Sequence, residues 1–233
     1  MALIDNLVSY WKLDESSDGS SPVTRADSAG SNTLSDGNTT PSAAAKISNG
    51  ANFRAASSEY LYKTAFSGLN FGTGDFSISS WVYFTANPDG KVVMHWGVES
   101  PFRSASFSIG GGGTLNLYIN DGASTSVSST GTVGTSGWHH VVVTRTSGTV
   151  AFYIDGADAS GGGSNTRSVP ASGGLFFAMQ FGLYVAIDLL QDEVGVWSRA
   201  LSGAEVTTLY NSGAGLTYPF TVASANGNFL GLM

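Results

Sequence analysis

Carboxylates gather in the segment between residues 14 and 36, where their chemistry would suit a calcium ion. They are Asp14, Glu15, Asp18, Asp27 and Asp36, and they stand among Ser, Gly and Asn residues. Calcium takes about six to eight oxygen ligands, usually from a few carboxylates and from loop carbonyls. The same residue types also form Asx turns and solvated loops. The segment is therefore a candidate calcium loop, with a purely structural loop as the alternative.

Aromatic and amide side chains supply the parts of a second kind of site, one for carbohydrate. A sugar ring has apolar faces and hydroxyl groups, so its site needs a flat aromatic ring near Asp, Asn or backbone amides. The tryptophans available for such a platform are Trp81, Trp96, Trp138 and Trp197. We take Trp96 as the candidate ring and Asn116, Asn120 and Asp121, at a strand and its turn, as the polar partners. The competing interpretation places the tryptophans in a thick core and the polar residues in ordinary turns.

Catalytic groups are not evident in the sequence. Glycoside hydrolysis with retention needs two carboxylates about 5 to 5.5 Å apart on one strand face. The only acidic pair on a predicted strand is Asp192 and Glu193, and sequence neighbours on a strand point to opposite faces. A Ser-His-Asp triad is equally unsupported, because His139 and His140 face opposite ways and no serine stands in a nucleophile elbow. We therefore predict no catalytic residues and no enzymatic activity.

Alternation of apolar and polar residues with a period of two is the dominant pattern along the chain. In residues 76–84, for example, Phe76, Ile78, Val82 and Phe84 collect on one face. Similar strands are predicted at residues 7–13, 91–96, 105–109, 115–119, 138–144, 150–154, 174–181 and 189–197. Asn-Gly, Asp-Gly and Ser-Gly pairs between them suit tight turns. About ten short strands joined in this way predict two packed antiparallel sheets.

One short helix is expected near the end of the chain. Ser202 and Glu205 match a capping box, and Val206, Leu209 and Tyr210 follow at helical spacing. We expect this helix to lie on the sandwich as a lid or edge cover. No repeat or composition break divides residues 1–213, which are predicted to form one domain, whereas residues 214–233 form an apolar tail without a charged side chain.

The charge and composition of the chain exclude several kinds of binding partner. The chain of 233 residues carries ten Lys and Arg against seventeen Asp and Glu, a net charge of -7, and has no basic run. Nucleic acid is therefore excluded as a partner, because binding it requires neutralisation of phosphates. No run approaches the roughly 18 apolar residues of a membrane helix, so we expect a soluble protein without a membrane partner. The absence of cysteine removes disulfides, thiolate metal sites and a cysteine nucleophile.

Six segments, in order, resemble the landmarks of the laminin G-like, concanavalin A-like lectin/glucanase superfamily. They are residues 7–15 (LVSYWKLDE), 26–30 (ADSAG), 75–82 (DFSISSWV), 137–141 (GWHHV), 152–156 (FYIDG) and 191–202 (QDEVGVWSRALS). The resemblance covers about residues 6–213 and implies an all-β jelly-roll sandwich of two antiparallel sheets. It also implies a calcium ion, with Asp27 and Asp192 as ligands beside Asp14, and a surface that binds sugar or protein.

The single-module length, the missing leader and the uncharged tail also resemble standalone members found among phage virion proteins. This resemblance predicts a non-catalytic surface module, a capsid decoration or tail appendage with glycan binding, on the virion surface. Its partners would be capsid or tail proteins and surface glycans, and its apolar tail would join copies into a homo-oligomer. A secreted or cell-surface lectin of bacterial origin and a glycoside hydrolase are the alternatives.

Overall fold

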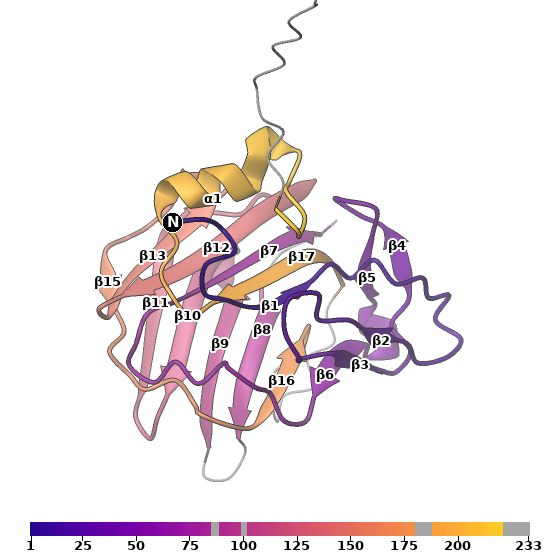
Figure 1. Ribbon diagram of the computed structural model, residues 1–233, viewed down its shortest axis with the longest axis horizontal. Helices are drawn as coiled ribbons and strands as arrows, with labels where there is room; N and C mark the ends of the chain where they lie inside the picture. The colour runs from indigo at the N-terminus through magenta and orange to yellow at the C-terminus, as the bar shows by residue number, and fades with distance from the viewer. Residues whose placement is uncertain (85–88, 99–101, 180–187, 221–233) are drawn as a thin grey trace, which may run out of the picture.

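The computed structural model describes residues 1–84, 89–98, 102–179 and 188–220. These residues form two antiparallel β-sheets that pack into a sandwich (Figure 1), as the sequence predicts. Sheet A has the order β14-β13-β12-β7-β17-β5-β4, with β1 also paired to β17 and β15 to β13. Its strands are β1 (Leu7–Trp11), β4 (Ser42–Ala44), β5 (Asn49–Phe53), β7 (Phe76–Tyr83), β12 (Trp138–Thr146), β13 (Thr149–Ile154), β14 (Ala157–Asp158), β15 (Gly163–Ser164) and β17 (Leu189–Trp197).

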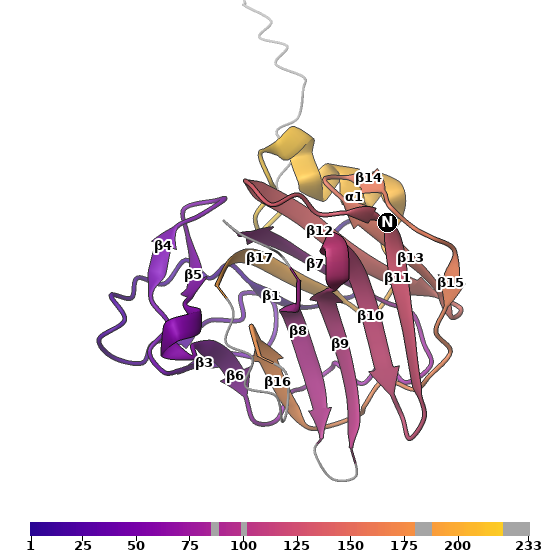
Figure 2. The ribbon, with the colours of Figure 1, turned by 180° about the vertical axis from the view of Figure 1, so that it is seen from behind.

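Sheet B has the order β11-β10-β9-β8-β16-β6-β3-β2, and Figure 2 shows β8, β9 and β10 side by side from the other side of the molecule. Its strands are β2 (Thr24–Arg25), β3 (Leu34–Gly37), β6 (Tyr60–Lys63), β8 (Lys91–Val98), β9 (Arg103–Ile109), β10 (Thr114–Asn120), β11 (Ser124–Thr132) and β16 (Gly174–Phe177). The helical elements are α1 (Gly203–Tyr210) and the short 3-10 helices η1 (Ala55–Ser57), η2 (Gly111–Gly113) and η3 (Asn211–Gly213).

The core lies between the sheets and follows from the alternation along the strands. On β7, Phe76, Ile78 and Val82 are buried on the inner face, as their spacing predicts. The two sheets meet where Trp11 of β1 contacts Phe177 of β16 edge to face, with ring centroids 5.1 Å apart. Each such side chain contributes roughly 1.5 to 3 kcal/mol when it is fully buried.

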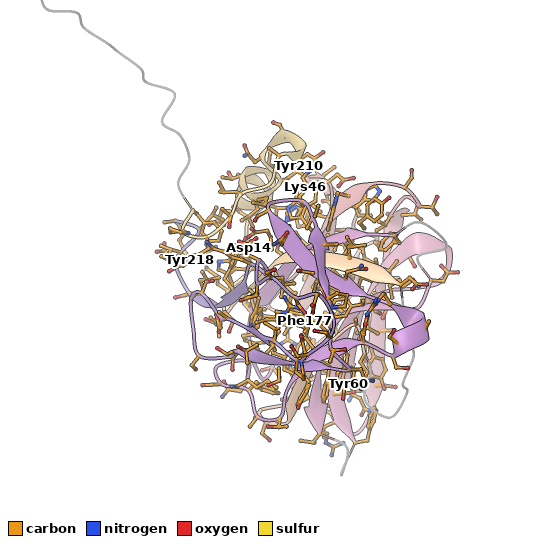
Figure 3. The ribbon with its side chains drawn as sticks, turned by 90° about the vertical axis from the view of Figure 1, so that its right-hand side faces the viewer. Asp14, Lys46, Tyr60, Phe177, Tyr210 and Tyr218 are labelled. Carbon is orange, nitrogen blue, oxygen red and sulfur yellow. The ribbon has the colours of Figure 1, made fainter. Side chains whose placement is uncertain are left out.

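The two outer faces of the sandwich can be followed in side view. In Figure 3 the core residue Phe177 lies between Asp14 and Lys46 above and Tyr60 below. Lys46 belongs to the sheet A side, where its Nζ lies 4.6 Å from the centre of the Trp81 ring. Tyr60 belongs to β6 of sheet B. The outer face of sheet A and the outer face of sheet B are therefore two separate surfaces of the protein.

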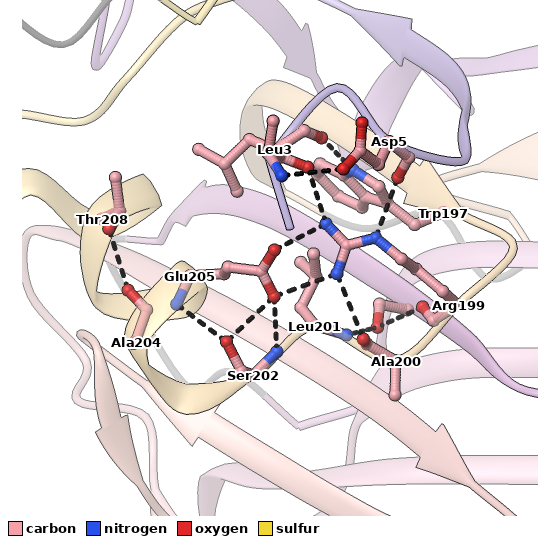
Figure 4. A network of polar contacts seen from close by, with 12 residues as sticks. Leu3, Asp5, Trp197, Arg199, Ala200, Leu201, Ser202, Ala204, Glu205 and Thr208 are labelled. Carbon is pink, nitrogen blue, oxygen red and sulfur yellow. Dashed lines mark hydrogen bonds and ion pairs between the residues drawn. The ribbon is translucent and has the colours of Figure 1, made fainter.

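Helix α1 begins with the predicted capping box. Ser202 Oγ accepts the amide hydrogen of Glu205, and the Glu205 carboxylate accepts that of Ser202 at 2.9 Å. Arg199 donates to both oxygens of Glu205, at 2.9 and 2.7 Å, and also to the carbonyl of Asp5 (Figure 4). This network joins the end of β17, the first turn of α1 and the N-terminal segment.

The outer face of sheet A is covered by α1 and by residues 214–220. Val206 and Leu209 of α1 pack in one buried cluster with Tyr10 and Trp197. Tyr218 and Phe220 also pack in this cluster. The first part of the predicted tail thus folds back on its own sandwich, whereas the predictions for Phe229, Leu230, Leu232 and Met233 lie outside the described residues.

The strand predictions hold for the long apolar strands and miss several short or polar ones. All nine predicted segments contain strands, although residues 180 and 181 of one of them lie outside the described residues. Strand β11 was not predicted, because Ser, Thr and Gly fill most of its positions and give no apolar pattern. The short strands β2 to β6, β14 and β15 were not predicted either. In the described ranges, no helix has the length and apolar character needed to cross a membrane.

A β-bulge in β17 overturns the prediction that Asp192 and Glu193 point to opposite faces. Asp192 pairs with Trp81, and the register then shifts before Gly195 pairs with Ser79. Glu193 has a positive φ of 49° and is the extra residue of the bulge. Its carboxylate reaches Tyr10 on the outer face of sheet A, the face on which Asp192 also lies. The bulge therefore places two acidic side chains together.

Candidate functional site

The middle strands of sheet B present an uncharged polar surface built around Tyr118. On β10 the inner face buries Leu115, Leu117 and Ile119, so the alternate residues must point outward. These are Asn116, Tyr118 and Asn120, all half-buried. Two of the three residues, Asn116 and Asn120, are predicted site residues, and the structure brings them together on the two sides of the tyrosine ring.

Serines on both neighbouring strands extend this surface. Tyr118 lies opposite Ser106 of β9 and Ser126 of β11, and Asn116 lies opposite Ser108 and Ser128. We call the residues Asn116, Tyr118, Asn120, Ser108, Ser126 and Ser128 the Tyr118 face, whereas Ser106 is buried beside it. Asn116 Nδ2 donates to Ser128 Oγ at 3.0 Å, and Asn120 Nδ2 donates to Tyr118 Oη at 3.2 Å. These bonds hold the amides beside the ring and leave further donor and acceptor positions.

Sequence reasoning missed Tyr118 although a signal was present. The residue stands two positions from both Asn116 and Asn120 on a predicted strand, which places all three on one face. The search for an aromatic platform considered tryptophans and therefore passed over this tyrosine.

A row of aligned residues, all but one with a ring, crosses sheet B from Tyr118. Strand pairing aligns Tyr118 with Ser106, Ser106 with His95, His95 with Phe176, and Phe176 with Tyr62. His95 and Phe176 are buried, whereas Tyr62 is half-buried. Burial lowers the pKa of His95 to about 4, so this imidazole is neutral near pH 7. The row is therefore apolar at its centre and polar at the Tyr118 end.

The third polar residue predicted for this site, Asp121, lies beyond β10 in the turn to β11. Its Oδ2 accepts the amide of Ser168 at 3.0 Å, and its Oδ1 lies 3.4 Å from a guanidinium nitrogen of Arg167. The amide of Ser168 is the main cause that lowers the Asp121 pKa. Asp121 also lines a pocket of about 310 Å³ together with Arg103. The β10–β11 turn that carries Asp121 lies at the end of the sandwich away from α1 (Figure 1).

The tryptophan predicted to hold a ligand is placed in the core instead. Trp96 is fully buried on the inner face of β8 and meets Phe76 edge to face at 6.3 Å. A bound sugar on the surface cannot reach it, so the prediction of Trp96 as a ligand residue is wrong. Trp81 and Trp197 are also buried, and only Trp138 among the four candidates is half-buried, on sheet A.

The carboxylates of the candidate calcium loop are occupied by the chain itself. Asp27 Oδ1 accepts the amides of Tyr10, Ala29 and Gly30 at 2.9, 3.1 and 2.8 Å, and Oδ2 accepts that of Asn32 at 2.8 Å. The other loop carboxylates are engaged in the same way: Asp14 by the Asn49 amide, Glu15 by the Ala26 amide, Asp18 by Ser20 and Asp36 by Arg25 and the Val23 amide.

Asp192, the other predicted ligand, is buried on sheet A. Its Oδ2 accepts the amide of Ile47 at 2.8 Å, and the charge of Asp14 adds to burial in raising its pKa to about 8. Within the described part of the chain, no three His, Cys, Asp or Glu side chains are grouped as metal ligands. Asp14, Asp27 and Asp192 therefore do not form such a group among the described residues.

Asp192 and Glu193 resemble an acid pair with perturbed pKa values, but they are sealed from solvent. Burial raises the pKa of Glu193 to about 7, and the two residues are 0% and 2% exposed. Tyr10 Oη lies 2.5 Å from Glu193 Oε2, and the backbone of Leu216 covers the same tyrosine at 3.2 Å. A glycan has no path to these carboxylates through the described residues that enclose them.

A buried Ser-His contact is likewise incomplete as a catalytic triad. Ser79 Oγ lies 2.8 Å from His140 Nε2, but the carboxylate of Asp155 pairs with His139 Nδ1 and reaches only the backbone amide of His140, not its imidazole. Burial lowers the pKa of His140 to about 4. The ring is also covered by Trp81 at 5.2 Å. These two residues therefore serve packing on sheet A.

The family model described as concanavalin A-like lectin/glucanases superfamily matches residues 55–207. Among curated proteins, none matches the chain significantly. Among solved structures, the chain is similar to domain 4 of AbnA, a GH43 extracellular arabinanase from Geobacillus stearothermophilus, in complex with arabinotriose. The TM-score is 0.69 at 18% identity, and the match covers 87% of this chain and 97% of that one.

Two toxin structures are similar over nearly the whole chain. The binding domain of Paraclostridial Mosquitocidal Protein 1 has a TM-score of 0.65 at 17% identity and is matched over 91% of this chain. Botulinum neurotoxin type C, whose cell entry depends on interaction with two ganglioside molecules, has a TM-score of 0.62 at 14% identity over 90% of this chain. The chain spans about half the length of these toxin structures, 53% and 52%. At such identities the likeness is one of fold.

Proposed function

The chain belongs to the concanavalin A-like lectin/glucanase superfamily, and from this premise we propose that it is a non-catalytic module that binds glycans on the Tyr118 face. The observation that carries the proposal is the register of β9, β10 and β11. It sets one half-buried aromatic ring between two amides, with the hydroxyls of Ser108, Ser126 and Ser128 nearby. A glycan-binding surface needs this combination of an apolar ring and hydrogen-bonding groups.

The chemistry of the face fits a neutral, hydroxyl-rich ligand. A pyranose ring packs its C–H face on the Tyr118 ring, while its hydroxyl groups bond to the side-chain amides of Asn116 and Asn120. Ser126 and Ser128 are exposed at the edge of the sheet and accept or donate further bonds. No charged side chain belongs to the face, so binding does not require the desolvation of a charge. The solved likenesses named above include a domain in complex with arabinotriose, which supports this ligand class.

The non-catalytic part of the proposal is supported by what encloses the acidic residues. Hydrolysis needs an acid pair that a substrate reaches. Asp192 and Glu193 are buried on the outer face of sheet A, which α1 and residues 214–220 cover. A secreted or cell-surface lectin of bacterial origin would use the same Tyr118 face. A glycoside hydrolase would require an accessible pair, so it is the less favoured alternative.

Glycan binding is tested with an oligosaccharide array followed by calorimetry on the best ligand. Replacing the ring in Tyr118→Ala should weaken binding about tenfold or more, because the stacking platform is lost, and tenfold corresponds to about 1.4 kcal/mol. The matched control is Tyr83→Ala, which removes a half-buried tyrosine from sheet A. Equal binding by wild type and Tyr118→Ala would contradict the proposal, as would an array without any bound glycan.

We propose the surface of a phage particle as the setting, with capsid or tail proteins as partners and the C-terminal tail as the contact between copies. The support is the resemblance of the chain to standalone virion modules. Fractionated particles should contain the full chain, and truncation after Asn226 should abolish attachment or self-association without lowering the melting temperature. A protein found only in the particle-free fraction would contradict this setting.

A further inference from the structure

The pocket beside the β10–β11 turn carries a cation, Arg103, whose guanidinium has no described partner. The pocket has a volume of about 310 Å³ and is lined by Val98, Arg103, Asp121 and residues 168–172. Arg103 is half-buried at the start of β9. Among the residues that the structure describes, none forms an ion pair or a hydrogen bond with its guanidinium. Its five N–H donors are therefore available to a ligand.

The turn is shaped to receive this guanidinium. Gly122 has a φ of +116°, and a Cβ atom on it would lie 2.3 Å from Arg103 Nη1. Only glycine therefore allows the planar group to rest against the turn. The amide of Gly122 in turn donates to Oδ1 of Asn120, a residue of the Tyr118 face, at 2.9 Å. The pocket and the Tyr118 face are thus joined through one turn of the chain.

The acidic residue of the pocket does not cancel the charge of Arg103. Asp121 has its own partners, the amide of Ser168 at 3.0 Å and the guanidinium of Arg167 at 3.4 Å. Among the described residues named here, two arginines and one aspartate leave a net positive charge beside the pocket. The chain as a whole carries -7, but at physiological ionic strength charges more than about 8 Å away are largely screened. Among the described residues around the pocket, Arg103 is therefore the charged group that Asp121 does not pair with.

We infer that this pocket binds the carboxylate of an acidic sugar residue, with Arg103 as the residue that selects it. This inference rests on the proposed function and extends it, since the neutral part of the same glycan lies on the Tyr118 face. A guanidinium presents two parallel N–H groups that match the two oxygens of a carboxylate. The exposed Ser168 and Ser172 offer hydroxyl groups to the sugar, and Val169 and Pro170 provide an apolar wall.

The inference is tested with matched pairs of oligosaccharides that differ only in the carboxylate. One pair is sialyllactose and its methyl ester, and the other is tri-galacturonic acid and its methyl ester, so that the two sources of the carboxylate are separated. The wild-type protein should bind the acidic member of at least one pair tenfold or more tightly. Arg103→Gln should remove that preference without changing affinity for the neutral member, whereas Arg103→Lys should retain part of it. The matched control is Lys91→Gln, an equal loss of charge at the opposite end of β8.

The outcomes separate this inference from the proposed function. Equal affinity for acidic and neutral members, with Tyr118→Ala weakening both, would overturn the role of Arg103 and leave glycan binding intact. Preference for a sulfated sugar over the carboxylated one would also overturn it. Binding to none of the oligosaccharides would overturn both proposals. Because no described residue bonds to the Arg103 guanidinium, the melting temperature of Arg103→Gln should match that of the wild type, which shows that the variant is folded.

Discussion

At the scale of single residues, Asp27 organises the loop that follows β1. Its two carboxylate oxygens accept four backbone amides, which come from Tyr10, Ala29, Gly30 and Asn32. Hydrogen bonds to a charged group are stronger than those between neutral groups, at about 1.5 to 3 kcal/mol each in net terms. The residue therefore stabilises the fold directly, through the backbone of the chain.

Replacing Asp27 with Asn should lower the free energy of unfolding by about 2 to 3 kcal/mol, because an N–H₂ group then faces at least one amide donor. Urea unfolding measures the change, and it should be the same with a chelator and with added calcium. Asp18→Asn, a control in the same loop whose carboxylate bonds only to Ser20 and is exposed, should change stability little. Stabilisation of the wild type by calcium that Asp27→Asn lacks would instead make Asp27 a calcium ligand, as the family resemblance predicts.

At the scale of elements, the segment of residues 214–220 is held against sheet A by the hydroxyl group of Tyr10, which lies between the Glu193 carboxyl group and the Leu216 carbonyl. Tyr10 Oη lies 2.5 Å from Glu193 Oε2 and 3.2 Å from the carbonyl oxygen of Leu216. A tyrosine hydroxyl has a single proton, so it donates to one of these oxygens at a time. When Glu193 is protonated it donates to Tyr10 Oη, and Tyr10 then donates to Leu216. When Glu193 is charged, Tyr10 donates to the carboxylate and Leu216 loses its donor.

Stability should therefore fall as pH rises from about 5 to 8. Burial raises the pKa of Glu193 to about 7 from an ordinary value near 4.5, so the folded state holds a proton that the unfolded state releases. The stabilisation is complete below pH 4.5 and is lost as pH passes 7, by on the order of 3 kcal/mol. Melting curves across this range should show a smaller loss for Glu193→Gln than for wild type or for Asp158→Asn, an exposed control. Equal pH dependence in all three proteins would contradict this account.

The elements that could be predicted from sequence are those held by contacts between residues close together in the chain. The capping box that begins α1 involves Ser202 and Glu205, three residues apart, and both of its bonds form as expected. The bulge at Glu193 escaped prediction because a positive φ is unusual for glutamate and is held by a bond to Tyr10, far away in the sequence. The Tyr118 face was half predicted, since strand parity is local while the pairing of β10 with the serines of β11 depends on the sheet. The burial of Trp96 could not be read from its spacing alone.

At the scale of the whole molecule, the two outer faces of the sandwich are used differently. The outer face of sheet A is covered by α1 and residues 214–220, whose Leu209 and Phe220 pack with Trp197 (Figure 1). On sheet B, β10 and β11 keep half-buried and exposed side chains on their outer face. The sandwich therefore has one covered face that stabilises the fold and, on β10 and β11 of the other sheet, a polar surface that is available to a ligand.

The most direct measurement of the central claim is an amide chemical-shift titration of the labelled protein with its best-bound oligosaccharide. The account predicts that the shifts concentrate on residues 104–108, 114–120 and 124–128, the strands that carry the Tyr118 face, and that Tyr118→Ala abolishes them. Shifts confined to α1 and the strands of sheet A, with residues 114–120 unchanged, would contradict it.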